Sequence, residues 1–117
     1  MKLETLIESV GGRMRIPERC GGADITRVFA SNEMSALLEQ AGPGTLLVTT
    51  LAGAQLGCLA ELMDCPALCL ADDTDPDPDL LETARLCGTA VVLSPLDMSE
   101  TYDCLSRRLA GNDSRRS

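Results

Sequence analysis

Short apolar runs alternate with segments of helical periodicity along most of this chain, and no other feature restricts its fold as strongly. The runs at 25–30, 45–50, 66–71 and 89–93 are rich in aliphatic residues and predict strands. Each is followed by a segment whose apolar residues recur at helical spacing. Strands separated by helices favour right-handed crossovers and a parallel sheet covered by helices on both faces.

Two further elements are expected near the N-terminus. Residues 2–10 place apolar side chains on one helical face, and Gly11 with Gly12 is typical of a helix end. Residues 13–16 alternate polar and apolar side chains, which indicates another short strand. The sequence therefore predicts an α/β fold with three layers, α/β/α, and a mainly parallel sheet of four to five strands.

The chain has the length of one domain, because 117 residues bury one core readily and two only with difficulty. We place that domain at residues 1–110 and expect a disordered polar tail at residues 111–117. No apolar run approaches the roughly 20 residues of a membrane span. The N-terminal residues carry no signal-peptide core. A cytoplasmic location without a membrane partner is therefore expected.

Charge and residue types exclude several classes of function. The net charge of −8 repels phosphate backbones, so nucleic acid is not an expected partner. Histidine is absent, which removes histidine-based triads and dyads, and the only lysine is Lys2. No glycine motif of a phosphate-binding loop occurs. We therefore expect neither catalytic residues nor a cofactor.

Six cysteines include no Cys-x-x-Cys pair. Cys58, Cys69 and Cys87 fall on apolar faces, where cysteine behaves as a small hydrophobic residue. Structural, reduced cysteines are the favoured interpretation, and a zinc or iron–sulfur site is the alternative.

The acidic run at 72–79 invites a calcium interpretation. A calcium loop aligned on this run would need glycine at Pro78 and glutamate at Ala84, so the motif fails. A solvated loop with a helix cap at Asp77 is the favoured interpretation, and a weak magnesium site is the alternative. No metal site is therefore predicted.

Polar side chains stand where the predicted strands end. The carboxyl ends of parallel strands share one sheet edge, where helix starts offer N–H groups to an anion and ligands gather near a switch point in strand order. The candidate ligand-binding residues are Ser31, Asn32, Glu33, Ser35, Thr49, Thr50 and Ser94. The alternative is that Ser31 and Asn32 only cap the following helix.

The predicted helix at 52–63 is apolar nearly all round its circumference. A helix of this kind is usually well buried. It is covered either by its own domain or by a second copy of the chain, and we expect a homodimer.

Three segments carry a resemblance to a known family. They are Ala-Ser-Asn-Glu-Met-Ser at 30–35, Gly-Thr-Leu-Leu-Val-Thr at 44–49 and Ala-Glu-Leu-Met-Asp-Cys-Pro-Ala at 60–67. Together with the helix-to-strand spacing of 79–93, they make the chain resemble the DRTGG domain family over roughly residues 1–110. The Asp-Arg-Thr-Gly-Gly signature is missing. The chain is similar to divergent stand-alone members, with Asn32 in place of the usual acid.

This resemblance implies a domain similar to the N-terminal domain of HPr kinase. In larger proteins, family members sit beside phosphotransacetylase domains or nucleotide-sensing CBS domains of pyrophosphatases, where they are regulatory or dimer-forming. Stand-alone members are associated with iron-only hydrogenase and redox gene clusters. The resemblance carries over no catalytic residue.

Three functions remain open on this basis. The first is a non-catalytic regulatory or ligand-sensing module that binds a nucleotide or other small anion at the strand ends. The second is a scaffold or assembly protein of a hydrogenase-associated redox complex, with a redox enzyme as partner. The third is a small transferase that uses Ser31 or Glu33. The lack of catalytic groups favours the first.

Overall fold

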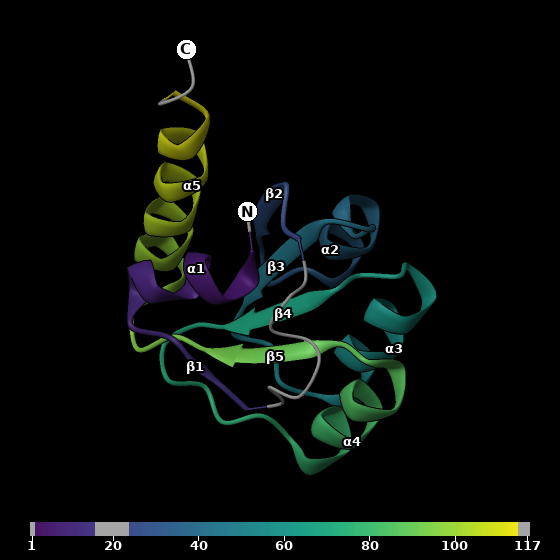
Figure 1. Ribbon diagram of the computed structural model, residues 1–117. Helices are drawn as coiled ribbons and strands as arrows, with labels where there is room; N and C mark the ends of the chain where they lie inside the picture. Colours follow the sequence, from purple (N-terminus) through teal and green to yellow (C-terminus); the bar gives the residue numbers. More distant parts are fainter. Residues whose placement is uncertain (1, 16–23, 115–117) are drawn as a thin grey trace.

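The computed structural model describes residues 2–15 and 24–114. The elements along the chain are α1 (Leu3–Ile7), the 3-10 turn η1 (Glu8–Val10), β1 (Arg13–Met14), β2 (Arg27–Ala30), α2 (Met34–Gln40), β3 (Thr45–Thr49), α3 (Ala54–Leu62), β4 (Ala67–Leu70), α4 (Pro78–Cys87), β5 (Ala90–Leu93) and α5 (Met98–Ser114) (Figure 1). The predicted alternation of strand and helix from residue 25 onward is confirmed.

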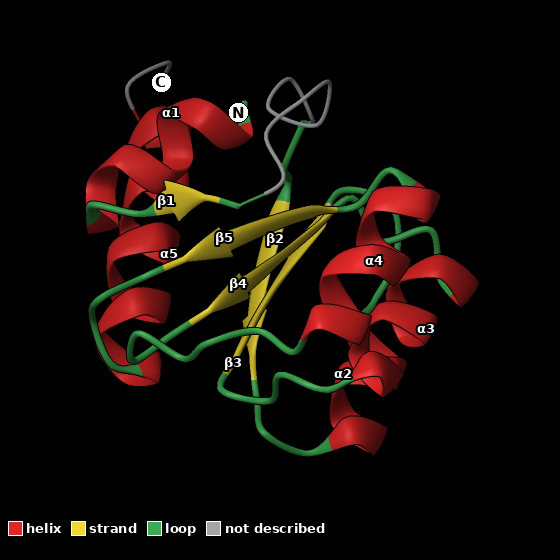
Figure 2. Cartoon of the chain, turned by 90° about the horizontal axis from the view of Figure 1, so that it is seen from below, coloured by secondary structure: helices red, strands yellow, loops and turns green. Residues whose placement is uncertain are grey.

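A five-stranded sheet divides the described part of the chain into three layers. Its strand order is β1-β5-β4-β3-β2, and only β1 runs antiparallel to its neighbour. Helices α1 and α5 cover one face of the sheet, while α2, α3 and α4 cover the other (Figure 2). The predicted three-layer α/β fold with a mainly parallel sheet is confirmed.

The parallel strands wind in a single direction. Each of β2, β3 and β4 pairs with the next strand along the chain. Because every crossover has the same sense, all three connecting helices lie on one face. The strand order reverses nowhere between β2 and β5, so there is no switch point among the parallel strands. The expectation of a switch point near the candidate residues is therefore wrong, although the carboxyl ends of the parallel strands still share one edge.

The central strands are buried on both faces, which explains their continuous apolar runs. Successive side chains enter opposite layers, since the period of a strand is two residues. Leu46 and Val48 belong to the core beneath α1 and α5, whereas Leu47 belongs to the core beneath α2, α3 and α4. The sheet therefore carries one aliphatic core on each face.

Local signals in the sequence place several helix ends. Asp97 caps α5, since its Oδ1 accepts a hydrogen bond from the Glu100 N–H at 2.8 Å. Gly88 ends α4 in the left-handed conformation with φ of 77°. Asp77 occupies the N-cap of α4, but its side chain makes no capping hydrogen bond.

The last helix is longer than expected. Its backbone continues to Ser114, four residues into the segment predicted as a disordered tail, and residues 115–117 lie outside the described range. Each added helical residue gains a backbone hydrogen bond, which opposes the cost of about 1 kcal/mol of a helical glycine such as Gly111. Among the described residues, no helix has the length and apolar character needed to cross a membrane.

Candidate functional site

Asn32 joins the carboxyl ends of two neighbouring strands. Its Oδ1 accepts hydrogen bonds from the Thr49 hydroxyl and the Thr50 N–H, both at 2.8 Å. The Thr49 hydroxyl in turn accepts from the Leu51 N–H at 3.1 Å. Asn32 therefore fixes the loop after β2 against the loop that leads into α3. The alternative in which Asn32 caps α2 is wrong, because its acceptor is used across the sheet edge.

The other polar residues of this loop have different roles. The Ser31 hydroxyl accepts a hydrogen bond from the Glu33 N–H at 3.0 Å and so stabilises the turn into α2. Glu33 is the N-cap of α2, although its side chain makes no capping bond. Glu33 and Ser35 are exposed. Of the predicted set, the structure thus brings Asn32, Thr49 and Thr50 into direct contact.

Ser94 stands apart from this cluster. It follows β5, and β5 is separated from β2 by β4 and β3, a distance of about 14 Å at normal strand spacing. Ser94 is fully buried, and its hydroxyl lies 2.8 Å from the Thr101 hydroxyl of α5 and accepts from the Leu96 N–H. These bonds fasten α5 to the sheet. Ser94 therefore has a structural partner on the opposite layer from α2 and α3.

A cavity of about 240 Å³ opens beside Asn32. Its polar wall combines Asn32 with Gly53, the N-cap of α3, and its apolar wall includes Leu51 and Leu56. The first turn of a helix exposes N–H groups that have no partner within the helix, and Gly53 supplies no capping side chain. The cavity can therefore accept both an apolar ring and a hydrogen-bond acceptor.

A larger groove of about 550 Å³ continues between α2 and α3. Met34 and Gln55 line both the groove and the cavity, so the two are adjacent. The groove is lined by Met34, Ser35, Leu38, Ala54, Gln55, Cys58, Leu59 and Leu62. We call it the α2–α3 groove.

The α2–α3 groove corrects the expectation that helix 52–63 is well buried. Leu62 is 75% exposed, and Cys58 is also exposed. Only a narrow stripe of α3 faces the core, and Gly57 in that stripe lets α3 approach α4 closely. The remaining apolar side chains of α3 therefore face solvent.

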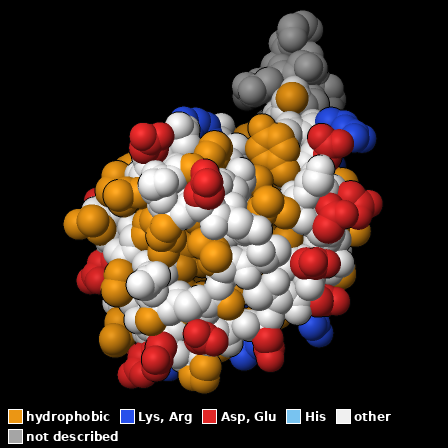
Figure 3. Space-filling model, turned by 180° about the vertical axis from the view of Figure 1, so that it is seen from behind, with side chains coloured by type: hydrophobic (Ala, Val, Ile, Leu, Met, Phe, Trp, Pro, Cys, Tyr) orange, Lys and Arg blue, Asp and Glu red, His pale blue; other side chains and the backbone are white. Residues whose placement is uncertain are grey.

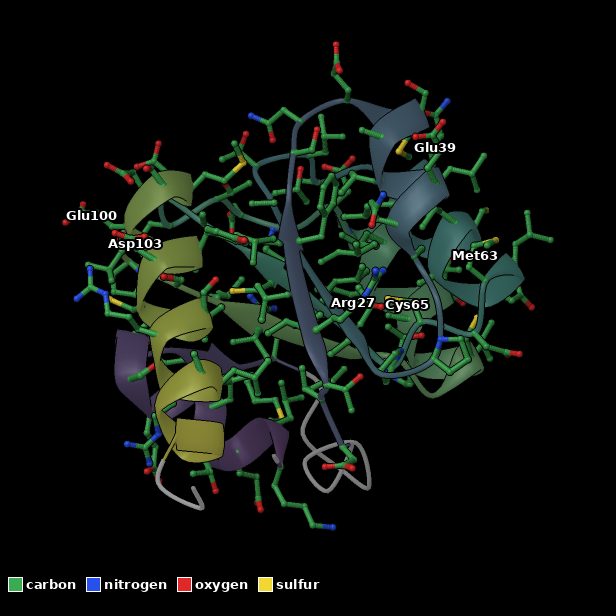
Figure 4. The ribbon with its side chains drawn as sticks, turned by 90° about the horizontal axis from the view of Figure 1, so that it is seen from above. Arg27, Glu39, Met63, Cys65, Glu100 and Asp103 are labelled. Carbon is green, nitrogen blue, oxygen red and sulfur yellow. The ribbon has the colours of Figure 1, made fainter. Side chains whose placement is uncertain are left out.

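The surroundings of the cavity are acidic. Asp77 Oδ2 lies 3.8 Å from the point that a Cβ on Gly53 would occupy, beside the start of α3. Glu33 and Asp73 are exposed at the same sheet edge. Arg27 lies at the opposite, amino end of β2, close to Cys65 (Figure 4), and its guanidinium donates to the Gln40 carbonyl. A bare anion at the strand ends would thus meet carboxylates rather than a basic side chain.

Three of the described cysteines, Cys65, Cys69 and Cys87, have raised thiol pKa values. Burial raises the pKa of Cys69 to about 12 and also raises the pKa of Cys65, whose thiol donates to the Thr45 carbonyl. Desolvation and the Glu61 carboxylate raise the pKa of Cys87. A thiol with a raised pKa holds little thiolate at neutral pH. Among the described residues, no cluster of three or more metal-binding side chains forms; Cys20 lies outside that range.

Comparison with solved structures gives a regulatory region as a neighbour. It is the CBS and DRTGG domains of the Clostridium perfringens pyrophosphatase, complexed with the activator diadenosine tetraphosphate. The TM-score is 0.69 at 16% identity, over 89% of this chain and 45% of that chain. The chain thus spans less than half of that neighbour. No protein-family model and no curated protein matches. The similarity supports a DRTGG-like fold, while membership of the family stays a prediction.

Sequence reasoning predicted Asn32 and Ser35 but missed the rest of the walls of the cavity and the groove. Leu51 and Gln55 drew no attention because neither belongs to a recognisable motif. The exposed leucines had a usable signal, since a helix that is apolar all round cannot turn every side chain toward one sheet. That signal predicted a partner or a cover for α3, and the structure leaves this face of the helix open.

Proposed function

We propose that this protein is a non-catalytic regulatory module that senses a small ligand in the cavity beside Asn32. The observation that carries the proposal is the pairing of an apolar wall at Leu51 and Leu56 with polar groups at Asn32 and the start of α3. Small-molecule sites typically combine apolar lining with a few convergent polar groups. The DRTGG-like fold, found in a regulatory region that binds a nucleotide, supports a role of the same kind.

The ligand class follows from the charge around the cavity. An apolar wall suits a purine ring, and the N–H groups of α3 suit an acceptor such as a ribose or phosphate oxygen. Asp77 and Glu33 oppose an uncompensated polyphosphate. We therefore propose a nucleoside, or a nucleotide whose charge is balanced by Mg²⁺, as the ligand.

Thermal unfolding with adenosine, AMP, ATP and diadenosine tetraphosphate, each with and without Mg²⁺, tests the proposal. A ligand at a hundredfold excess over its Kd adds about 2.7 kcal/mol to the free energy of unfolding. That corresponds to a rise in Tm of roughly 10 °C for a domain of this size. Stabilisation by adenosine, and by ATP mainly with Mg²⁺, is the expected result. No shift with any of the four would reject the nucleotide class.

Two charge-changing substitutions test whether the ligand binds in the cavity. Gln55→Lys adds a cation to its wall and should tighten binding of AMP, whereas Asn32→Asp keeps the acceptor for Thr49 and Thr50 but adds a negative charge and should weaken it. Ser99→Lys and Ser99→Asp make the same charge changes in the first turn of α5, on the other layer. Equal effects at positions 55 and 99 would indicate a general charge effect instead of a site.

A homodimer remains part of the proposal. Strand β2 is an edge strand of the sheet, and Val28, Phe29 and Ala30 are half-buried, so its outer edge is a candidate contact between copies. Sedimentation equilibrium tests this, and a monomer at every concentration would remove it.

The transferase alternative has less support. The Ser31 hydroxyl accepts a bond from the Glu33 N–H, and no described base lies within hydrogen-bonding distance of it. A Ser31→Ala variant that behaves as wild type in every assay would remove this option. The scaffold alternative rests on the α2–α3 groove, which presents an open apolar surface.

A further inference from the structure

We propose that the α2–α3 groove docks an amphipathic helix of a partner protein, with basic residues flanking the apolar stripe of that helix. This inference concerns protein binding and does not depend on the ligand proposed for the neighbouring cavity. Its basis is the combination of an apolar floor with a rim that carries charge of one sign.

The floor of the groove has the shape and chemistry of a helix-binding site. Two helices form its walls, and Met34, Leu38 and Leu62 supply large flexible side chains. Leu38 is 43% and Leu62 75% exposed, which is unusual for leucines that lie together. Hydrophobic side chains gather on the face seen from behind, with mostly acidic side chains around its margin (Figure 3). A helix binds such a groove through anchors at positions i, i+3, i+4 and i+7.

The rim of the groove selects a basic partner. The segments 33–41 and 53–64, which form both walls, contain four carboxylates, no lysine and no arginine. Glu33 and Glu39 are exposed on the α2 wall and form the rim, whereas Glu61 and Asp64 are exposed around a separate pocket toward Cys87 of α4. Glu39 points away from α2 toward solvent (Figure 4). Opposite charge across an interface accelerates association and excludes partners with the wrong sign.

The same rim disfavours the other occupants of an apolar face. Two copies of this chain joined through the groove would bring the carboxylates of one rim against those of the other. An anionic membrane surface would also be repelled. Arg85, the basic residue of the described helices α2, α3 and α4, lies on α4 outside both walls, and Arg27 of strand β2 donates to the Gln40 carbonyl at the C-terminal end of α2. A cationic helix from a different protein satisfies both the floor and the rim.

Model peptides test the proposal without knowledge of the natural partner. Fluorescence anisotropy would compare the full chain with a labelled helix of leucine and lysine, a helix of leucine and glutamate with the same leucine spacing, and a leucine–lysine peptide of scrambled order. The first should bind about tenfold or more tightly than either of the others, because the second carries the wrong sign of charge for the rim and the third lacks leucine anchors at helical spacing. Comparable affinities for the first and third would overturn the proposal.

Matched variants distinguish the groove from the overall negative charge. Leu62→Asp should weaken binding of the leucine–lysine helix about tenfold or more. Leu86→Asp is the matched control, because Leu86 is 81% exposed on α4 and lies outside the groove. It should change the affinity by no more than about twofold. Glu39→Lys and Glu100→Lys change the net charge equally, but Glu100 lies on α5 in the opposite layer (Figure 4). Only Glu39→Lys should weaken binding.

Two outcomes would refute the docking of a foreign helix. Equal losses at positions 39 and 100, or at 62 and 86, would show that the peptide responds to general charge or hydrophobicity. Sedimentation of the wild type as a dimer that Leu62→Asp converts to a monomer would assign the groove to a second copy of the chain. Leu62→Asp and Leu86→Asp both replace highly exposed side chains, so we expect both variants to fold normally, and circular dichroism checks this.

Discussion

Replacing Gly57 by alanine tests how closely α3 must approach α4. A Cβ at this position would lie 2.9 Å from both Cβ and Cγ2 of Thr83 and 3.3 Å from Cδ1 of Leu80. Thr83 cannot turn away easily, because its Cβ is held by the backbone and its hydroxyl donates to the Asp79 carbonyl. Overpacking of this kind costs about 1–3 kcal/mol, and we expect the upper half of that range.

The helix itself benefits from the same change, since alanine is favoured over glycine by about 1 kcal/mol in a helix interior. The net loss should be about 1–2 kcal/mol, a fall in Tm of roughly 4–8 °C. Differential scanning calorimetry measures it. Gly42→Ala is the matched control, because a Cβ there meets nothing within 4 Å. That variant should keep or slightly raise the Tm. A Gly57→Ala variant as stable as the wild type would refute the close-contact argument.

Three further predictions concern the strand ends and the thiols. Asn32→Leu leaves the buried Thr49 hydroxyl and the Thr50 N–H without their acceptor, so the free energy of unfolding measured in urea should fall by about 2 kcal/mol. Adding Thr49→Val removes the unsatisfied hydroxyl, so the double variant should lose less stability than Asn32→Leu alone. Folding raises the pKa of Cys69 from 9.0 to about 12, so the unfolded chain loses the thiol proton at a lower pH than the folded chain. The free energy of unfolding should therefore fall by about 1.4 kcal/mol per pH unit between pH 9 and pH 12. A Cys69→Ala variant whose stability falls equally steeply over this range would contradict the prediction. Iodoacetamide should modify the exposed Cys58 well before Cys69, and peptide mass spectrometry that found the reverse order would contradict the burial of Cys69.

Most secondary structure could be predicted because each element carries a local signal. The run at 45–50 is continuous and β-prone, and a strand buried on both faces requires that composition. Asp97 followed three residues later by Glu100 is a recognisable capping signal, and the structure contains that cap at the start of α5. Strand order could not be predicted, since one direction of winding and a reversal at a switch point produce the same alternation of elements along the chain.

The candidate site was predicted only in part for the same reason. Asn32 follows β2 and Thr49 ends the adjacent β3, so their contact depends only on pairing between successive strands. Ser94 has the same local sequence character, but its partner, Thr101, lies on α5, and the side of the sheet that α5 covers is a tertiary property. Polarity at a strand end therefore does not distinguish a ligand-binding hydroxyl from one that fastens a helix.

Single-direction winding has a consequence for the order in which this chain folds. Strands β2, β3 and β4 each pair with the next strand along the chain, so these contacts close short loops and can form one after another. Strand β1 is different, because the pairing of Arg13 with Leu93 joins opposite ends of the sequence and has the largest loop-closure entropy. We therefore expect β1 and α1 to dock last during refolding. In native-state hydrogen exchange, the Arg15 amide, which donates to Val91, should open before the amides of β3 and β4.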